Sequence, residues 1–395
     1  MMRSLCCLAF SVVALSACSA PVPVPLHIHH ISQSGQGAYE VSLAVSDAGL
    51  AAAWHDTRDG NPEIYARRLD PDGRPTGPEW RLTDDQRLSY EADVALLDDS
   101  LVVAWYDRSS DGRLESRVGR WARDGTRTWV RSLPVSSPES ATRDTKARNP
   151  LVLVRGTTMF CAWIEPAADG ASAVYGQWLD EDGQAVTAPA LLAPAGDTTW
   201  NMSGVLDEQG RPWLVFDAAV GTAREELFLV RLLPSGPVVL QLTDDDGFAS
   251  KYPDLALSEG RLALTWFDER DGNREVYMFG GSLDDLADVG VGARRVTQTV
   301  GESIGAYVNW NGGRIGLAWS DDHDGQHEVY FQTFDPSGAP LEPARRLTDN
   351  ATASLIPAIV PLADGFGLAW NEDIVAERGD HESGGRSEIV FTRVE

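Results

Sequence analysis

The sequence predicts an all-β protein, a seven-bladed β-propeller of four-stranded antiparallel blades. Aromatic residues close short apolar runs at intervals of 50 to 58 residues. The intervals contain further short apolar runs, separated by turns rich in the 37 Gly and 22 Pro of the chain. A fixed period built of short strands indicates small sheets that must pack against one another, since none can bury its faces alone. The seven aromatic positions are Trp54, Trp105, Trp163, Phe216, Trp266, Trp319 and Trp370.

Each unit divides into four expected strands, as the first unit illustrates. Apolar residues alternate at 43–45, which predicts the first strand, and the run 50–54 that ends in the aromatic predicts the second. Glu-Ile-Tyr at 63–65 begins the third strand, and Asp-Pro-Asp-Gly at 70–73 supplies a hairpin turn before the fourth, which ends at 82–84. Because the aromatic occupies the same strand position in every unit, we expect it to be buried in the core.

The two ends of the chain complement each other. The last unit stops at 393–395, after its third strand, while the apolar segment 26–31 lies before the first unit, where a fourth strand would be placed. We therefore expect the N-terminal strand to complete the last blade. Such closure joins the first and last repeats of a ring that has no covalent crosslink.

The N-terminal residues are typical of an exported protein. Arg3 precedes an apolar stretch from 5 to 15, too short to span a bilayer, and Leu-Ser-Ala-Cys follows at 15–18. This pattern resembles the lipobox of bacterial lipoproteins, which implies that Cys18 is acylated, and Ser19 favours the outer membrane by the same analogy. The expected domains are a signal peptide at 1–17, the lipidated cysteine and a Pro-rich tether at 18–25, and the propeller at 26–395. The propeller would then lie in the periplasm or on the cell surface.

The net charge and the cysteine content limit the kinds of binding partner and crosslink that we expect. The formal net charge is −26, which repels nucleic acid and anionic lipid, so we expect no nucleic-acid partner and membrane attachment by the lipid alone. Cys161 is the one cysteine of the propeller region, which excludes an internal disulfide. We expect a monomer whose partner is an envelope protein or a saccharide.

The repeat also resembles a known family. Residues 58–65 contain Arg-Asp-Gly-Asn-Pro-Glu-Ile-Tyr, 81–84 contain Arg-Leu-Thr-Asp, and 270–277 repeat the first stretch closely. This pattern is similar to the repeat of TolB-type, WD-repeat-like propellers, and it implies a periplasmic or envelope scaffold that binds proteins or small ligands. The chain departs from TolB in its longer units, its seven rather than six blades, and its lack of a preceding α/β domain.

The candidate binding residues lie where the chain leads into the first strand of a blade. These lead-in residues differ from blade to blade, whereas the Asp-rich turns between strands two and three are repeated. A repeated residue is expected to have a structural role, and residues that vary near the axis are expected to recognise a ligand. The predicted ligand-binding residues are Tyr39, Glu40, Tyr90, Glu91, Arg148, Asn149, Trp200, Asn201, Lys251 and Tyr252.

No cofactor or metal is expected. Calcium at the Asp-rich turns is an alternative, but Arg58 and Arg270 lie inside them, where a cation would instead pair with the flanking carboxylates. The histidines show no metal-ligand spacing.

Two functions from different classes remain open. The sequence favours a non-catalytic binding scaffold on the propeller face that carries the lead-in residues. The alternative is a sialidase-like, glycan-cleaving enzyme with its site at the axis, for which Glu40, Glu91, Tyr90 and Tyr252 could serve. The Asp boxes of sialidases are absent from the sequence, which disfavours that alternative.

Overall fold

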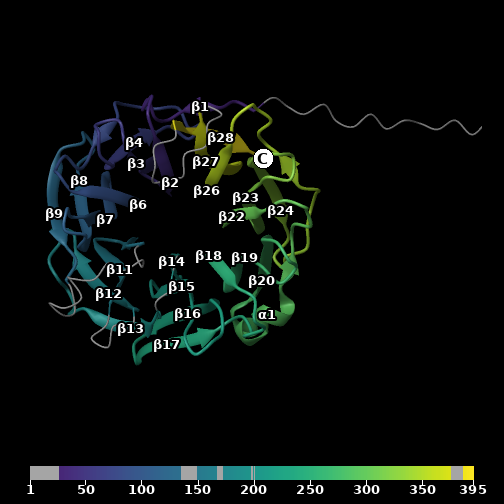
Figure 1. The fold of residues 1–395 in the computed structure, drawn as a ribbon. Coiled ribbons are helices and arrows are strands. Elements are labelled where there is room, and N and C mark those ends of the chain that lie inside the picture. The colour runs from purple at the N-terminus through teal and green to yellow at the C-terminus, as the bar shows by residue number, and fades with distance from the viewer. Residues whose placement is uncertain (1–25, 135–148, 167–171, 197–198, 200, 375–385) are drawn as a thin grey trace, which may run out of the picture.

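The repeats fold into seven four-stranded antiparallel sheets arranged around a common axis (Figure 1). The computed structural model describes residues 26–134, 149–166, 172–196, 199, 201–374 and 386–395. The first strands of neighbouring blades contact one another, so they form the inner wall of the ring. These features confirm the predicted all-β, seven-bladed β-propeller.

The first four blades have the following strands. Blade 1 contains β2 (Ala38–Ser46), β3 (Gly49–Asp56), β4 (Glu63–Leu69) and β5 (Trp80–Arg81). Blade 2 contains β6 (Leu88–Leu97), β7 (Ser100–Arg108), β8 (Leu114–Trp121) and β9 (Arg127–Ser132). Blade 3 contains β10 (Leu151–Arg155), β11 (Thr158–Pro166), β12 (Ser172–Asp180) and β13 (Ala190–Pro194). Blade 4 contains β14 (Met202–Leu206), β15 (Pro212–Ala218), β16 (Glu226–Leu233) and β17 (Gly236–Gln241).

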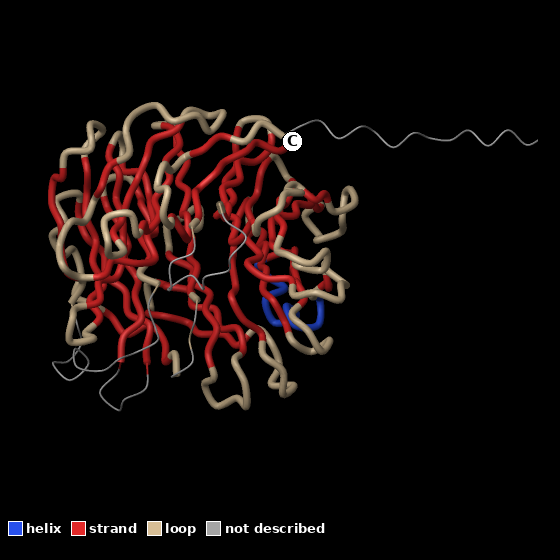
Figure 2. Tube along the Cα trace, turned by 45° about the horizontal axis from the view of Figure 1, so that its top comes forward, coloured by secondary structure: helices blue, strands red, loops and turns tan. Residues whose placement is uncertain are grey.

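The remaining blades follow the same order. Blade 5 contains β18 (Ser250–Ser258), β19 (Arg261–Asp268), β20 (Glu275–Ser282) and β21 (Arg294–Arg295), with the short helices η2 (Leu283–Asp288) and α1 (Val289–Gly292) before β21. Blade 6 contains β22 (Ser303–Asn311), β23 (Arg314–Asp321), β24 (Glu328–Phe334) and β25 (Arg345–Arg346). Blade 7 contains β26 (Ser354–Leu362), β27 (Gly365–Asp373), β28 (Ser387–Val394) and β1 (His29–His30). Within the described residues, Figure 2 shows helix at this one place beside blade 5.

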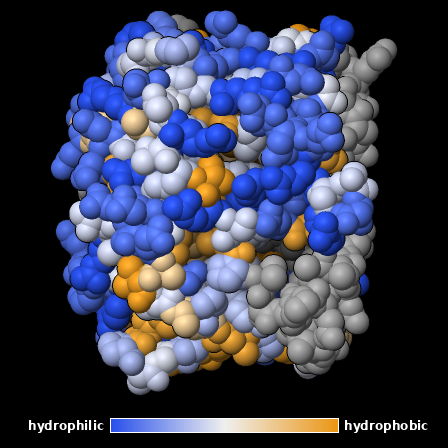
Figure 3. Space-filling model, turned by 90° about the vertical axis from the view of Figure 1, so that its left-hand side faces the viewer, coloured by the Kyte–Doolittle hydropathy of each residue, from blue (hydrophilic) through white to orange (hydrophobic). Residues whose placement is uncertain are grey.

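The aromatic residue that closes the second strand of each repeat, the origin residue, is buried, as predicted. All seven side chains are at most 2% exposed: Trp54, Trp105, Trp163, Phe216, Trp266, Trp319 and Trp370. They hold adjacent blades together, since Trp105 of blade 2 packs in one cluster with Ala53 and Ile64 of blade 1. The outer side of the ring shown in Figure 3 is mainly hydrophilic with smaller hydrophobic areas, which is consistent with a core located between blades.

In four blades the indole nitrogen of the buried tryptophan donates to a carboxylate two residues later in the same strand: Trp54, Trp105, Trp266 and Trp370. In blade 5 the indole Nε1 of Trp266 donates to Asp268 at 3.0 Å, and Arg270 donates to the same carboxylate at 2.7 Å. Burial alone would raise the pKa of Asp268, but the hydrogen bonds from Arg270 and Trp266 outweigh it and lower that pKa. Trp54 donates to Asp56 in the same way at 3.1 Å. The Asp two residues after the tryptophan therefore has a structural role.

The ring closes through the N-terminal strand, which confirms that prediction. In the antiparallel pair β1–β28, His29 lies opposite Phe391 and His30 opposite Val390. The Ile31 amide donates to the Ile389 carbonyl at 2.8 Å, and the Ile389 amide donates to the Ser32 hydroxyl at 2.7 Å. Blade 7 is thus built from both ends of the chain.

Candidate binding site at the propeller axis

The lead-in residues lie on a backbone bulge that recurs around the inner wall. Pairing between the first and second strands shifts register after Tyr39 in blade 1, after Tyr90 in blade 2 and after Lys251 in blade 5. The next residue has a left-handed backbone conformation in each case. The φ angles are 54° at Glu40, 52° at Glu91 and 53° at Tyr252. A bulge re-aims side chains that a regular strand would place on the sheet faces, and left-handed non-glycine residues of this kind cluster at functional sites.

Side chains from opposite sides of the ring influence one another electrostatically. The pKa of Tyr252 is raised to about 12, first by burial and then by the negative charges of Asp217, Glu40 and Glu91. Blade 5 lies across the ring from blades 1 and 2 (Figure 1), so Glu40 and Glu91 act on Tyr252 only if these side chains extend toward the axis. Burial and the charges of Asp254 and Glu40 also raise the pKa of Tyr307 in blade 6.

A row of aromatic rings runs along blades 1 and 2 beside these carboxylates. The imidazole ring of His55 lies 5.5 Å from the Tyr39 ring and 5.3 Å from the Tyr90 ring, and Tyr90 stacks on Tyr106 at 5.5 Å. His55 is 2% exposed, and its Nδ1 lies 3.4 Å from the Glu40 carboxylate. Its Nε2 has no hydrogen-bond partner among the described residues. Sequence analysis missed His55, although its place directly after Trp54 is a signal that could have identified it.

We define the axial cluster as Tyr39, Glu40, His55, Tyr90, Glu91 and Tyr252. Asn149 extends the cluster toward blade 3, since its amide N–H donates to Glu91 at 2.9 Å and its side chain donates to Asn201 at 3.0 Å. Lys251 instead forms an ion pair with Glu225 at 3.1 Å. Arg148 and Trp200 lie outside the described residues. The axial cluster thus contains five predicted residues and His55, and two more predicted residues, Asn149 and Asn201, extend it.

Two half-buried aspartates join the inner strands of three blades each. Asp93 in blade 2 accepts from the Ser42 hydroxyl of blade 1 at 3.1 Å and from the Val152 amide of blade 3 at 2.8 Å. Asp254 makes the equivalent links from blade 5, to Ser203 at 2.6 Å and to Val308 at 2.8 Å. Burial raises the pKa of each carboxyl to about 6. The sequence analysis missed both, although each lies 12 residues before its blade's tryptophan.

The Asp-rich turns form ion pairs with their own arginines. Arg58 contacts Asp56 at 2.5 Å, and Arg270 contacts Asp268 at 2.7 Å, which is the expected pairing. Among the described residues no group of three or more His, Cys, Asp or Glu side chains is arranged to hold a metal ion. The predicted absence of a cofactor and the calcium alternative stay predictions.

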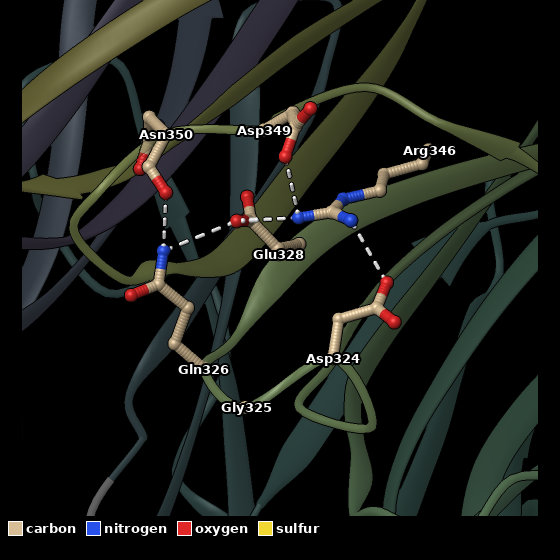
Figure 4. Close-up of a pocket in the computed structure, with 7 residues that line it drawn as sticks. All are labelled: Asp324, Gly325, Gln326, Glu328, Arg346, Asp349 and Asn350. Atoms are coloured by element: carbon tan, nitrogen blue, oxygen red, sulfur yellow. Dashed lines mark hydrogen bonds and ion pairs between the residues drawn. The ribbon is translucent and has the colours of Figure 1, made fainter.

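A polar recess of about 550 Å³ lies at the edge of blade 6 (Figure 4). Arg346 fills its centre and contacts Asp324 at 2.8 Å, Glu328 at 2.9 Å and Asp349 at 3.0 Å. Gln326 also donates to Glu328 at 3.2 Å. Arg346 thus already occupies the acidic recess, so the lead-in residues at the axis are the stronger candidates for ligand binding.

Comparison with solved structures identifies the fold. An α-L-arabinofuranosidase, Arb93A of Fusarium graminearum in complex with an iminosugar inhibitor, matches with a TM-score of 0.52 and 12% identity over 79% of this chain and 94% of that one. The Fusarium graminearum enzyme in complex with arabinobiose matches with a TM-score of 0.51, 12% identity, and coverage of 77% and 93%. A prolyl endopeptidase matches with a TM-score of 0.50 and 14% identity over 86% of this chain but 46% of that one. At these identities the likeness shows a shared propeller fold.

Comparison of the sequence identifies no family. No protein-family model matches the chain, and no curated protein matches it. The resemblance to TolB-type repeats therefore stays a prediction. Within the described residues, no helix is long and apolar enough to cross a membrane. Residues 1–25, which include Cys18, lie outside the described residues.

Proposed function

We propose that the protein is an envelope-anchored lipoprotein whose propeller binds a saccharide at the axial cluster without cleaving it. The observation that carries the proposal is the recurring bulge that places Glu40, Glu91 and Tyr252 in a left-handed conformation at the entries to three inner strands. Small-molecule sites commonly combine aromatic surface with a few convergent polar groups. Tyr252, which is 38% exposed, and the half-buried Tyr90 offer ring faces, and the half-buried carboxylates of Glu40 and Glu91 offer acceptors for sugar hydroxyls.

The chemistry of the axial cluster favours a saccharide over a protein partner. Its members lie on the inner wall of a ring, where a flat protein surface would have poor access. An arabinobiose complex on the same fold supports the proposal by analogy of fold alone. In this proposal acylated Cys18 and the tether 18–25 attach the propeller to the outer membrane, and the protein acts as a monomer.

Affinity electrophoresis through gels that contain soluble arabinan, xylan or peptidoglycan fragments tests the binding. We expect one polysaccharide to retard the protein, Tyr252→Ala and Glu91→Gln to restore its mobility, and Tyr252→Phe to have a smaller effect because the ring stays stacked on Phe267. Leu341→Ala is a control, because this exposed residue lies between β24 and β25, at the opposite end of the blade. Equal retardation of the wild type and Tyr252→Ala would contradict the proposal.

Glycan cleavage is the alternative, because the inner-strand bulges of blades 1 and 2 carry two carboxylates, Glu40 and Glu91. A glycosidase needs such a pair roughly 5–9.5 Å apart. Release of reducing ends from the retarding polysaccharide, lost in both Glu40→Gln and Glu91→Gln, would favour this alternative. Retention without such release supports the binding function.

A further inference from the structure

A buried glutamate at the start of strand three is paired with an arginine of strand four in three blades. In blade 6, Oε1 of Glu328 lies 2.9 Å from Nη2 of Arg346 (Figure 4). The same pair recurs in blade 1 as Glu63 and Arg81 at 3.0 Å, and in blade 5 as Glu275 and Arg295 at 2.9 Å. All three glutamates are 0% exposed. A buried carboxylate needs such a counter-charge, since leaving it unpaired carries a large desolvation penalty.

The arginines reach these carboxylates from the solvent side. The side chains of Arg81, Arg295 and Arg346 are 35%, 29% and 31% exposed. Each guanidinium therefore occupies a position that is buried at one end and open to water at the other. A cation from outside the chain could approach the same position by the same route.

Blade 4 keeps the glutamate and lacks the arginine. Glu226 lies opposite Ala218 on the neighbouring strand, as Glu63 lies opposite Asp56 in blade 1. It is also 0% exposed. Its Oε2 accepts from the Thr243 hydroxyl at 2.6 Å, but its Oε1 has no hydrogen-bond partner among the described residues.

Gln241 occupies the arginine's place without reaching the glutamate. It lies opposite Phe228, as Arg81 lies opposite Tyr65. The Gln241 side-chain amide donates to the Thr243 carbonyl at 2.8 Å, which is the bond that Nε of Arg81 makes to the Thr83 carbonyl in blade 1. The two terminal nitrogens of the guanidinium have no counterpart, so Oε1 of Glu226 lacks its donor.

The surroundings of Glu226 are strongly acidic. Burial raises its pKa to about 7, and the charges of Asp246, Asp268 and Asp245 add to the shift. The nearest arginine in sequence, Arg224, pairs instead with Glu269 at 3.4 Å and with Glu225 at 3.9 Å. Arg270 compensates part of this negative charge, since it pairs with Asp268 at 2.7 Å and lies 3.8 Å from Asp246. Among the described residues no cation pairs with Glu226 itself, so the position beside its carboxylate still favours one.

We infer that the position beside Glu226 binds a guanidinium group supplied by an arginine side chain of a partner protein or peptide. The shape argues for guanidinium because three other blades place that group against the same carboxylate oxygen. Metal chelation is disfavoured, since no three metal-ligating side chains converge there within the described residues. A basic partner also suits a chain with a net charge of −26. This site lies in a blade edge and is independent of saccharide binding at the axis.

Titration calorimetry of the full protein at pH 8, where Glu226 is ionised, tests the site with acetyl-Gly-Arg-Gly-amide. We expect this peptide to bind at least tenfold more tightly than its citrulline counterpart, which has the same shape without the charge. Gln241→Arg should weaken binding at least tenfold, because the new guanidinium fills the position, and should raise the melting temperature. Glu226→Gln should weaken binding to a similar extent.

Arg224→Ala is the matched control, since it removes a neighbouring cation and leaves the site intact. We expect its affinity for the arginine peptide to stay within twofold of the wild type. A tenfold gain would mean that Arg224 itself fills the position and would overturn the inference. Equal binding of the arginine and citrulline peptides, or undiminished binding by the correctly folded Gln241→Arg variant, would overturn it as well.

Discussion

The Ser32 hydroxyl donates a hydrogen bond to the Glu388 carboxylate across the joint between the two ends of the chain. In blade 1, the Thr83 hydroxyl does the same toward Glu63. In both blades the hydroxyl also accepts from the amide that follows the glutamate, at 2.7 Å from Ile389 and 2.8 Å from Ile64. The N-terminal strand therefore reproduces the fourth strand of an ordinary blade down to its buried polar contact.

Removing this joint should open the ring. We expect deletion of residues 26–32 to lower the melting temperature sharply, and Ser32→Ala to cost about 1–3 kcal/mol of unfolding free energy because it leaves buried polar groups without a partner. Urea unfolding followed by tryptophan fluorescence measures both. Ser109→Ala, in the exposed β7–β8 turn, is a control with little expected effect. An unchanged melt after the deletion would show that the joint does not hold the ring.

The origin tryptophans should be the most sensitive core positions. Trp266 is 0% exposed and packs with residues of blade 4. We expect Trp266→Ala to cost about 3–5 kcal/mol, because it leaves a large cavity. Trp266→Phe should cost less, because it leaves a smaller cavity although it also loses the bond to Asp268, and Phe216 fills the equivalent position in blade 4. Equal losses in the two variants would show that packing is not the main contribution.

The inner-wall aspartates should make stability depend on pH in an unusual direction. Because the pKa of folded Asp254 is about 6, above the unfolded value near 4, the folded state holds the proton more tightly. The stabilisation that Asp254 provides is therefore fully present below about pH 4 and is lost as the pH rises through 6. Relative to Asp254→Asn, the wild type should lose up to about 3 kcal/mol of unfolding free energy between pH 4 and 7.

Asp72 provides the matched control for this pH dependence. Its hydrogen bonds with Arg393 and Arg74 lower its pKa, so its stabilisation is present above the unfolded pKa and is lost as the pH falls. The difference in unfolding free energy between the wild type and Asp72→Asn should therefore change with pH in the opposite direction. Chemical denaturation at several pH values measures both differences, and a wild-type advantage over Asp254→Asn that is independent of pH would contradict the prediction.

Membrane attachment should depend on Cys18. We expect Cys18→Ser to move the protein from the membrane fraction to the soluble fraction, because no charge attraction to anionic lipid replaces the lost acyl chains. Cell fractionation with metabolic labelling by a fatty-acid analogue measures this change. Cys161→Ser serves as the control, since this thiol is buried in blade 3. Membrane retention of the unlabelled Cys18→Ser protein would exclude the lipid anchor.

The ring could be predicted from the sequence because its determinants are local. An aromatic at one strand position and a turn at a fixed offset recur whatever the neighbouring blade contains, and the missing fourth strand of the last unit matched the segment 26–31. That the lead-in residues bind a ligand stays a prediction. Their left-handed backbone at Glu40, Glu91 and Tyr252 was not predicted, because the bulge depends on how inner strands some 50 residues apart meet at the axis.

The residues that the sequence analysis did not identify were missed for one physical reason, namely that their partners belong to other blades. Asp93 and Asp254 bond to the blades on both sides, and a single repeat gives no sign of partners that belong to its neighbours. His55 directly follows an origin tryptophan, but its ring meets Tyr90 of the next blade. The sequence shows the loss of arginine, because Gln241 precedes Leu-Thr-Asp at 242–244 where Arg81 precedes Leu-Thr-Asp at 82–84. Its meaning required the buried Oε1 of Glu226, which only the folded chain reveals.

The pairing of His29 with Phe391 also constrains how the molecule can be made. During synthesis the first of these residues emerges long before the second, so blades one to six can assemble while the final sheet waits for the last residues of the chain. Until then the growing protein is an open arc with an unpaired strand at either end. A prematurely terminated product would keep both edges bare, which marks it for aggregation or proteolysis rather than accumulation.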